Sequence, residues 1–146
     1  DTIPLSFQKV NELPVGQQVI KPKTAADMRA MLELVVSGAH GSAKRAQVAG
    51  YRVGGKTGTA YKVENGRYAM PRKYIGSFVG MVPMSAPRFI IAVMIDEPTG
   101  PAHYGGQVAA PAFAAIATNA LRAMNVPPDS SVTEIVVPAN AGPEAM

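Results

Sequence analysis

The sequence predicts an α+β fold in which an antiparallel sheet is packed by helices. Apolar segments of strand length follow one another between residues 51 and 96, and a helical pattern precedes and follows them. The connections between these segments carry turn signals, which favours antiparallel neighbours. We therefore expect the strands to pair in sequence order.

The first helix is expected from about Ala25 to Val36. Thr24, with Asp27 three residues later, resembles a capping box at its start, and Gly38 and Gly41 end it. Apolar residues recur along it at i, i+3, i+4 and i+7, which predicts a face that packs in the core. These residues are Met28, Met31, Leu32 and Val35.

Three strands are expected, at Tyr51–Ala60, Tyr74–Val82 and Arg88–Asp96. The first connection contains the turn signal Glu64–Arg67, and the second is the short Pro83–Pro87 segment. The third strand is apolar on both faces, so we expect it to be covered on both sides.

The last helix is expected at about Val108–Met124. Its apolar residues recur at helical spacing, which predicts a stripe that packs on the sheet. The stripe consists of Phe113, Ile116, Ala117, Ala120, Leu121 and Met124.

The two ends of the chain differ from its centre. Residues 1–23 contain three prolines around Pro4–Val10, which we interpret as an edge strand followed by an extended connector. From Pro127 the composition turns to Pro, Ser, Ala and Gly, typical of an extended or disordered tail. We expect one domain portion at residues 1–126 and a tail at 127–146.

Composition narrows the function classes. The chain is 47% hydrophobic and 16% charged, as expected of a globular protein, and its net charge of +4 comes from scattered cations, so nucleic acid is not an expected partner. With no cysteine and two isolated histidines, neither a metal site nor another cofactor is expected.

The longest apolar run, Phe89–Ile95, is far too short for a membrane span. Any membrane anchor is therefore expected outside this chain. The start at Asp1 also suggests missing upstream sequence.

The most informative segment is Lys56-Thr57-Gly58-Thr59-Ala60. Its two hydroxyls are two residues apart, so they share one face of a strand, and the glycine between them lets another backbone approach closely. The lysine adds a point charge with three donors. These groups suit a site that holds a carboxylate beside a reacting carbonyl, although a lone edge-strand lysine also protects a sheet from aggregation.

Four segments in order carry a family resemblance: Gly50–Ala60 with its K-T-G, Tyr74–Gly80, Val93–Pro98 and Tyr104–Gly106. Together they resemble the C-terminal part of a class B penicillin-binding protein of the septal, cell-division type, over about residues 3–129. The resemblance implies a fragment of a serine transpeptidase/β-lactamase-like domain. It also implies a peptidoglycan D,D-transpeptidase, inhibited by β-lactams, in which a serine attacks a D-Ala-D-Ala amide and passes the acyl group to an amine.

The resemblance implies roles for individual residues. Lys56 would keep the site positive and help to move protons, and the Thr59 N–H would donate to the oxyanion. The hydroxyls of Thr57 and Thr59 would bind the terminal carboxylate. The full expected site has Lys56 and Thr59 as catalytic residues, and Thr57, Gly58, Thr59, Ala60, Tyr104 and Gly105 as residues that bind the stem peptide or a β-lactam.

The nucleophile is expected outside this chain. Ser6–Lys9 matches S-x-x-K as a string, but Pro4 and Pro14 do not suit the helix that must carry it, and no S-x-N is present. The expected partners are therefore an N-terminal part of the same protein that carries S-x-x-K and S-x-N, and membrane proteins of the divisome. The resemblance places the domain on the periplasmic side of the bacterial inner membrane.

Two alternatives remain open from the sequence. One is a fragment of a β-lactamase-like serine hydrolase, and the other is a non-catalytic module that binds a peptide or partner. Asp96 and Glu97 form a carboxylate pair, but we interpret them as the end of a strand because neighbouring strand residues point to opposite faces.

Overall fold

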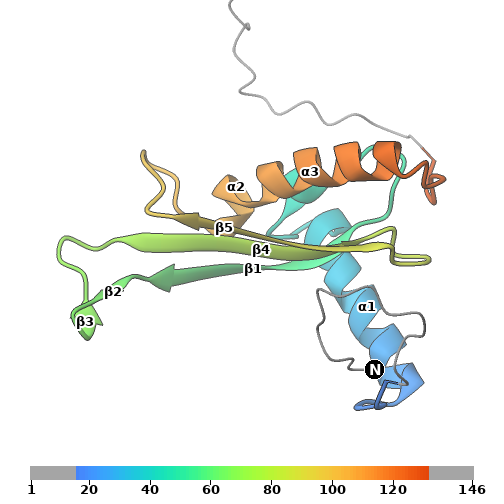
Figure 1. The fold of residues 1–146 in the computed structure, drawn as a ribbon, viewed down its shortest axis with the longest axis horizontal. Coiled ribbons are helices and arrows are strands. Elements are labelled where there is room, and N and C mark those ends of the chain that lie inside the picture. The colour runs from blue at the N-terminus through green and yellow to red at the C-terminus, as the bar shows by residue number, and fades with distance from the viewer. Residues whose placement is uncertain (1–15, 132–146) are drawn as a thin grey trace, which may run out of the picture.

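The computed structural model describes residues 16–131 and confirms an α+β fold with an antiparallel sheet (Figure 1). The main sheet has the order β1-β4-β5, so its strands pair in sequence order as predicted, and β2 and β3 form a small separate hairpin. The elements are α1 (Pro22–Ser37), the 3₁₀ helix η1 (Lys44–Ala46), β1 (Gly54–Tyr61), β2 (Val63–Glu64), β3 (Arg67–Tyr68), β4 (Tyr74–Val82), β5 (Phe89–Asp96), α2 (Gly105–Val108) and α3 (Ala110–Ala123).

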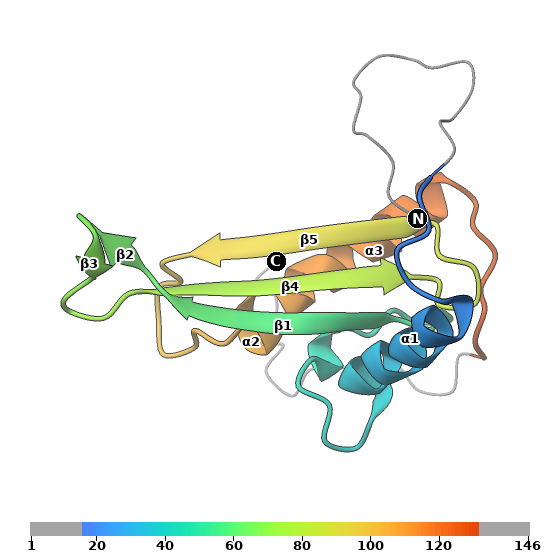
Figure 2. The ribbon, with the colours of Figure 1, turned by 90° about the horizontal axis from the view of Figure 1, so that it is seen from below.

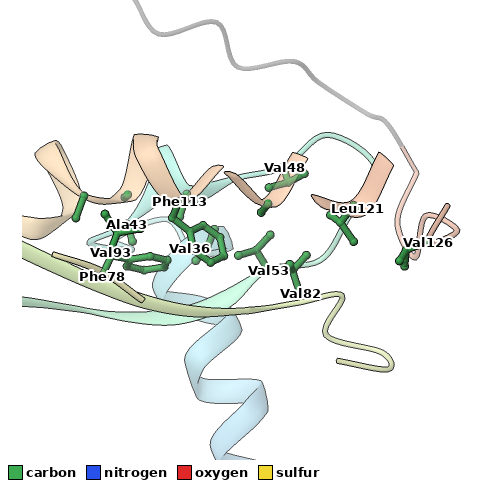
Figure 3. Packing of buried hydrophobic residues seen from close by; sticks show 14 residues of the cluster. Val36, Ala43, Val48, Val53, Phe78, Val82, Val93, Phe113, Leu121 and Val126 are labelled. Atoms are coloured by element: carbon green, nitrogen blue, oxygen red, sulfur yellow. The ribbon is translucent and has the colours of Figure 1, made fainter. Parts of the chain in front are cut away.

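The core lies between the sheet and α3 (Figure 3). Phe78 of β4 and Phe113 of α3 are both fully buried and meet edge to face, with 4.9 Å between ring centroids. The buried stripe of α3 is Ala110, Phe113, Ala117 and Leu121. Two residues of the predicted stripe, Ile116 and Met124, are instead exposed, because their side of the helix faces away from the sheet.

The predicted last helix is interrupted. Ala109 ends the short α2 and begins α3, and Pro111 occupies the first turn of α3. Proline has no N–H to donate and suits a first turn, which accounts for the break.

Helix α1 begins earlier than predicted, at Pro22, which is pre-organised for a first helical position. The predicted capping box is wrong: Lys21 is the N-cap and makes no side-chain cap, and Asp27 pairs with Lys23 at 2.7 Å. The predicted core face is also wrong at Met28 and Met31, which are exposed, because the first half of α1 projects beyond the sheet (Figures 1 and 2).

The second half of α1 is attached to the sheet. Val36 is buried in the core, and Glu33 accepts two hydrogen bonds from the Arg52 guanidinium, at 2.7 and 2.6 Å. This ion pair raises the Arg52 pKa, first through its hydrogen bond and then through charge attraction. It fixes α1 to the segment that leads into β1.

Strand β5 differs from its prediction, because only one face is covered in the described part of the chain. Val93 packs in the core beneath α3, whereas Ile90 and Met94 on the opposite face are 74% and 70% exposed. Figure 2 views the sheet from this side, which we call the open face.

Beyond α3, residues 127–131 form neither helix nor strand, but Asp129 is hydrogen-bonded to the fold. Its carboxylate accepts from the backbone N–H groups of Arg52 at 2.7 Å and Ser85 at 3.0 Å. The predicted strand at Pro4–Val10 and the tail from residue 132 lie outside the described residues. Within residues 16–131, no helix has both the length and the apolar character needed to cross a membrane.

Candidate functional site

The register of the sheet decides which way the K-T-G side chains face. Thr57 is opposite the buried Phe78, so its side chain lies on the α3 side of the sheet, and Thr59 follows on the same face. Lys56 is opposite the half-exposed Val79 and lies on the open face. The side chain of Lys56 and those of the two threonines therefore lie on opposite faces of the same edge strand.

The threonines line a cavity of about 400 Å³ at the β1 edge. The hydroxyls of Ser42 and Thr57 are 3.2 Å apart, and the Thr59 hydroxyl accepts a hydrogen bond from the Gly105 N–H at 3.3 Å. The loop before η1 and the start of α2 thus converge on the strand. The lining consists of Gly41, Ser42, Lys44, Arg45, Thr57, Thr59, Tyr104, Gly105, Gly106 and Gln107, and we call this cavity the threonine pocket.

Four of the expected site residues meet in this pocket, namely Thr57, Thr59, Tyr104 and Gly105. The other three, Lys56, Gly58 and Ala60, do not line it. Successive residues of a strand face opposite sides of the sheet, and these three positions belong to the open face. The Lys56 ammonium is exposed and donates to the Thr57 carbonyl at 2.9 Å.

Close backbone contact explains the two glycines at the start of α2. A methyl group on Gly105 would meet the carbonyl oxygens of Ser77 and Gly58, and one on Gly106 would meet the Ser42 carbonyl oxygen. Backbone atoms cannot move aside as a flexible side chain can. Glycine at both positions lets α2 sit directly on β1 and β4 and form one wall of the pocket.

A row of aromatic rings continues from the pocket rim along the sheet. Tyr104 packs against His103, with ring centroids 4.3 Å apart, and His103 stacks on Tyr74 at 4.0 Å. Tyr74 in turn contacts Tyr61 at 5.2 Å, and Arg72 lies 4.8 Å over the Tyr61 ring. His103 is therefore a half-buried stacking residue.

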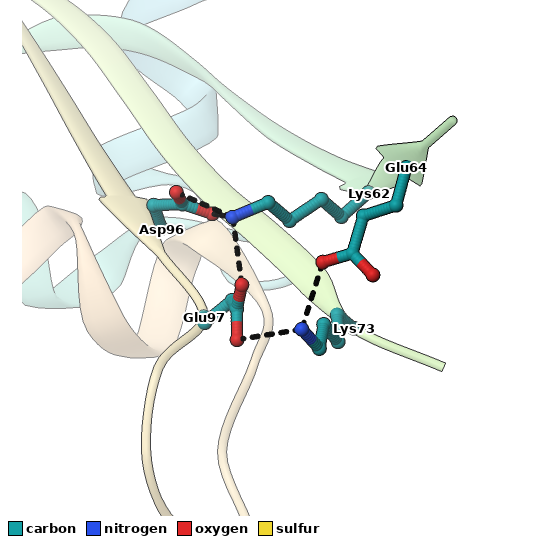
Figure 4. Close-up of polar contacts among 5 residues, drawn as sticks. All are labelled: Lys62, Glu64, Lys73, Asp96 and Glu97. Atoms are coloured by element: carbon teal, nitrogen blue, oxygen red, sulfur yellow. Dashed lines mark hydrogen bonds and ion pairs between the residues drawn. The ribbon is translucent and has the colours of Figure 1, made fainter. Parts of the chain in front are cut away.

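The carboxylates at the end of β5 belong to an ion-pair cluster (Figure 4). Lys62 contacts Asp96 at 2.8 Å and Glu97 at 2.7 Å, and Lys73 bridges Glu64 at 2.7 Å and Glu97 at 3.4 Å. Glu97 follows the strand with a φ of 50°, which turns its side chain back toward Lys62. The two carboxylates thus reach the same lysine, in contrast to the opposite directions expected of neighbouring strand residues.

The cluster shifts the pKa values of its members. The hydrogen bond from Lys62, followed by the attraction of Lys62 and Lys73, lowers the pKa of Glu97. Hydrogen bonds to Asp96 and Glu97 raise the pKa of Lys62, and a hydrogen bond to Glu64 does the same for Lys73. Glu97, Lys62 and Lys73 therefore stay charged at neutral pH, and the cluster ties the β2–β3 hairpin to the sheet.

Six of the lining residues are not among the expected site residues, namely Gly41, Ser42, Lys44, Arg45, Gly106 and Gln107. The signal that could have found two of them is the string Ala43-Lys44-Arg45-Ala46, in which the alanines are fully buried and the cations between them are exposed. Among residues 16–131, no group of three or more His, Cys, Asp or Glu side chains is placed to hold a metal ion.

Comparisons with known proteins agree with this geometry. The family model described as the penicillin binding protein transpeptidase domain matches residues 2–118. The chain is similar to the apo structure of the transpeptidase domain of Burkholderia pseudomallei penicillin-binding protein 3, with 52% identity and a TM-score of 0.73. This match covers 84% of the chain and 37% of the solved one.

Curated relatives give the same result. The chain is 40% identical over 142 residues to the probable peptidoglycan D,D-transpeptidase PenA of Neisseria flavescens, covering 95% of the chain and 35% of that protein. It is 41% identical over 131 residues to the peptidoglycan D,D-transpeptidase FtsI of Escherichia coli strain K12, covering 89% of the chain and 22% of that protein. The chain thus spans about a third or less of the length of these relatives.

Proposed function

This chain belongs to the penicillin-binding protein transpeptidase family, and we propose that it forms one wall of the active site of a peptidoglycan D,D-transpeptidase. The observation that carries the proposal is the threonine pocket, where two hydroxyls on one strand face stand beside cations and no carboxylate lines the wall. This chemistry suits the carboxylate that ends a D-Ala-D-Ala stem peptide or that is attached to a β-lactam ring.

The chemistry assigned to this wall is acyl transfer. A serine oxygen bonds to the carbonyl carbon of the penultimate D-Ala, the bond to the terminal D-Ala nitrogen breaks, and the free amino acid leaves with a proton. The amine of a neighbouring strand then bonds to the same carbonyl carbon, the bond to the serine oxygen breaks, and the proton lost by the amine returns to the serine. The Thr59 N–H serves as one oxyanion donor, and losing a single donor of this kind typically costs about 2.7–4 kcal/mol of transition-state stabilisation.

The serine belongs to an upstream part of the same protein, which we place against the open face of the sheet. Lys56 points to that side, and the exposed Ile90 and Met94 supply the apolar surface that a packed lobe buries. Lys56 is then close to the serine and moves its proton, while the threonines hold the carboxylate from the other side of the strand.

Penicillin acylation tests this proposal. The protein that carries this chain together with its upstream part is incubated with benzylpenicillin and digested, and mass spectrometry then locates the adduct. A stable adduct on a serine upstream of Asp1 supports a transpeptidase. Rapid turnover of the drug instead favours a β-lactamase-like hydrolase, and no acylation at any residue favours a binding module.

The family also suggests where this activity is used. We infer that the protein cross-links the cell wall during septum formation, facing the periplasm from the inner membrane together with membrane proteins of the divisome. The similarity to FtsI and to the stage V sporulation protein D of Bacillus subtilis supports a role in division-type wall synthesis. Depletion followed by microscopy tests this: filamentous cells without septa support the role, and normal septation contradicts it.

A further inference from the structure

The threonine pocket contains positive charge that no carboxylate of its lining neutralises. Lys44 and Arg45 both line it, and none of its lining residues is an aspartate or glutamate. At the far end of the sheet, by contrast, Lys62 and Lys73 are neutralised by three carboxylates. In the described part of the chain, neither Lys44 nor Arg45 takes part in an ion pair.

The short helix that carries these two cations is fixed in place. The N-cap Ala43 and the last residue of η1, Ala46, flank them and are 0% exposed, so the short helix is anchored in the core. The Arg45 Nη1 donates to the Gln107 carbonyl at 3.3 Å, which ties η1 to α2 across the pocket. A guanidinium has five N–H donors, so most of the Arg45 fork remains available to a ligand.

The charge also lies next to the hydroxyls that would bind a carboxylate. Ser42, two residues before Lys44, is in contact with Thr57, and the Thr59 hydroxyl is part of the same lining. Lys56 is on the other face of β1 and is bonded to the Thr57 carbonyl. The cations on the threonine side of the strand therefore come from η1 and not from the K-T-G lysine.

We propose that Arg45, with Lys44 beside it, supplies the positive charge that holds the ligand carboxylate in the threonine pocket. This inference rests on the proposed function and adds a specificity-determining residue to it. Arg45 selects acyl donors that end in a carboxylate, through a charge-assisted hydrogen bond for which its planar fork is suited. Lys44 adds charge without the same directionality.

The test compares benzylpenicillin with its methyl ester, which lacks the negative charge of the carboxylate and carries one added methyl group. Rates of acylation are measured by mass spectrometry on the complete transpeptidase domain, as wild type and with Arg45→Ala, Arg45→Lys and Lys44→Ala. We expect Arg45→Ala to slow acylation by the acid about tenfold or more and to change the ester rate less than about twofold. Arg45→Lys should recover part of the loss, and Lys44→Ala should cause a smaller loss.

Arg88→Ala is the matched control, since Arg88 is an exposed arginine that does not line the pocket. Equal losses for acid and ester in Arg45→Ala, or an unchanged acid rate when Arg45 and Lys44 are both replaced, would overturn the inference while leaving the transpeptidase proposal standing. Salt dependence gives a second measurement: the acid rate should fall with ionic strength more steeply in the wild type than in Arg45→Ala, and the ester rate should fall in neither. A wild type that neither ligand acylates would refute the proposed function itself.

Discussion

Lys56 is the residue whose replacement best separates chemistry from folding. Its side chain is exposed, and its one described hydrogen bond is to the carbonyl of the next residue, so Lys56→Ala should leave the melting temperature nearly unchanged. Acylation by penicillin should fall by a factor on the order of 10²–10⁴, the range typical for loss of a proton-transfer group. Acylation at the wild-type rate would refute the assigned role.

Thr59 tests carboxylate binding directly. Thr59→Val keeps the shape of the side chain but removes the hydroxyl that accepts from the Gly105 N–H, at a cost of roughly 1–3 kcal/mol in stability if that donor stays unpaired. Acylation by benzylpenicillin should fall more than acylation by its methyl ester. Thr59→Ser retains the hydroxyl and is the control, and a parallel loss for both ligands in Thr59→Val would count against the carboxylate site.

At the scale of elements, the position of α2 on the sheet depends on Gly105. Gly105→Ala places a methyl group against the carbonyl oxygens of Ser77 and Gly58, so α2 must shift away from β1 and β4. We expect a loss of about 1–3 kcal/mol in the free energy of unfolding, as is usual for overpacking, together with slower acylation. Gln107→Ala, in the same helix, is the control for stability, and a Gly105→Ala protein as stable as wild type would show that α2 is free to move.

The ion-pair cluster predicts a pH dependence for the attachment of the β2–β3 hairpin. The folded-state pKa of Glu97 is below its usual value of 4.5, so its stabilisation is present above that pH and is lost as the pH falls through the lowered pKa. The raised pKa values of Lys62 and Lys73 keep their contribution intact from neutral pH up to about 10.5.

Thermal unfolding of wild type and Glu97→Gln measures this effect. The difference in melting temperature should be constant between pH 6 and 8 and should shrink below about pH 4.5. A difference that stays the same down to strongly acid pH would mean that the charge of Glu97 contributes nothing. Arg67→Gln, in the same hairpin but outside the cluster, should show no such pH dependence.

At the scale of the whole molecule, the open face of the sheet leaves the apolar side chains of Ile90 and Met94 exposed within the described residues. If the upstream lobe covers it, Ile90→Ala should destabilise the complete domain by about 2–5 kcal/mol, as for a buried side chain. Ile116→Ala, on the outer side of α3, should change stability by no more than about 0.5 kcal/mol. An equally small effect at Ile90 would show that the open face stays in solvent.

The open face also shows where sequence patterns reach their limit. The strands and their order were predictable, because alternation and turn residues are local signals. Burial was not: Ile90, Met28 and Met31 have the apolar spacing of core residues, yet their exposure depends on which other segments pack against them. A pattern records that a face is apolar and does not record what covers it.

The candidate site was also predictable only in part. Thr57 and Thr59 could be assigned to one face from their spacing alone, and the K-T-G context indicated the chemistry. The string Ala43–Ala46 could have marked Arg45 as an exposed cation, but not its place in the pocket, because that place depends on a contact with Gln107, 62 residues later in the chain. Contacts between distant segments leave no periodic signal in the sequence.

A crystal structure of the complete domain acylated by benzylpenicillin is the most direct test of the central claim. We expect the drug bound to a serine on the open-face side, with its carboxylate about 2.7–3.2 Å from the hydroxyls of Thr57 and Thr59. A carboxylate directed away from the β1 edge, with the threonine pocket empty, would contradict the account.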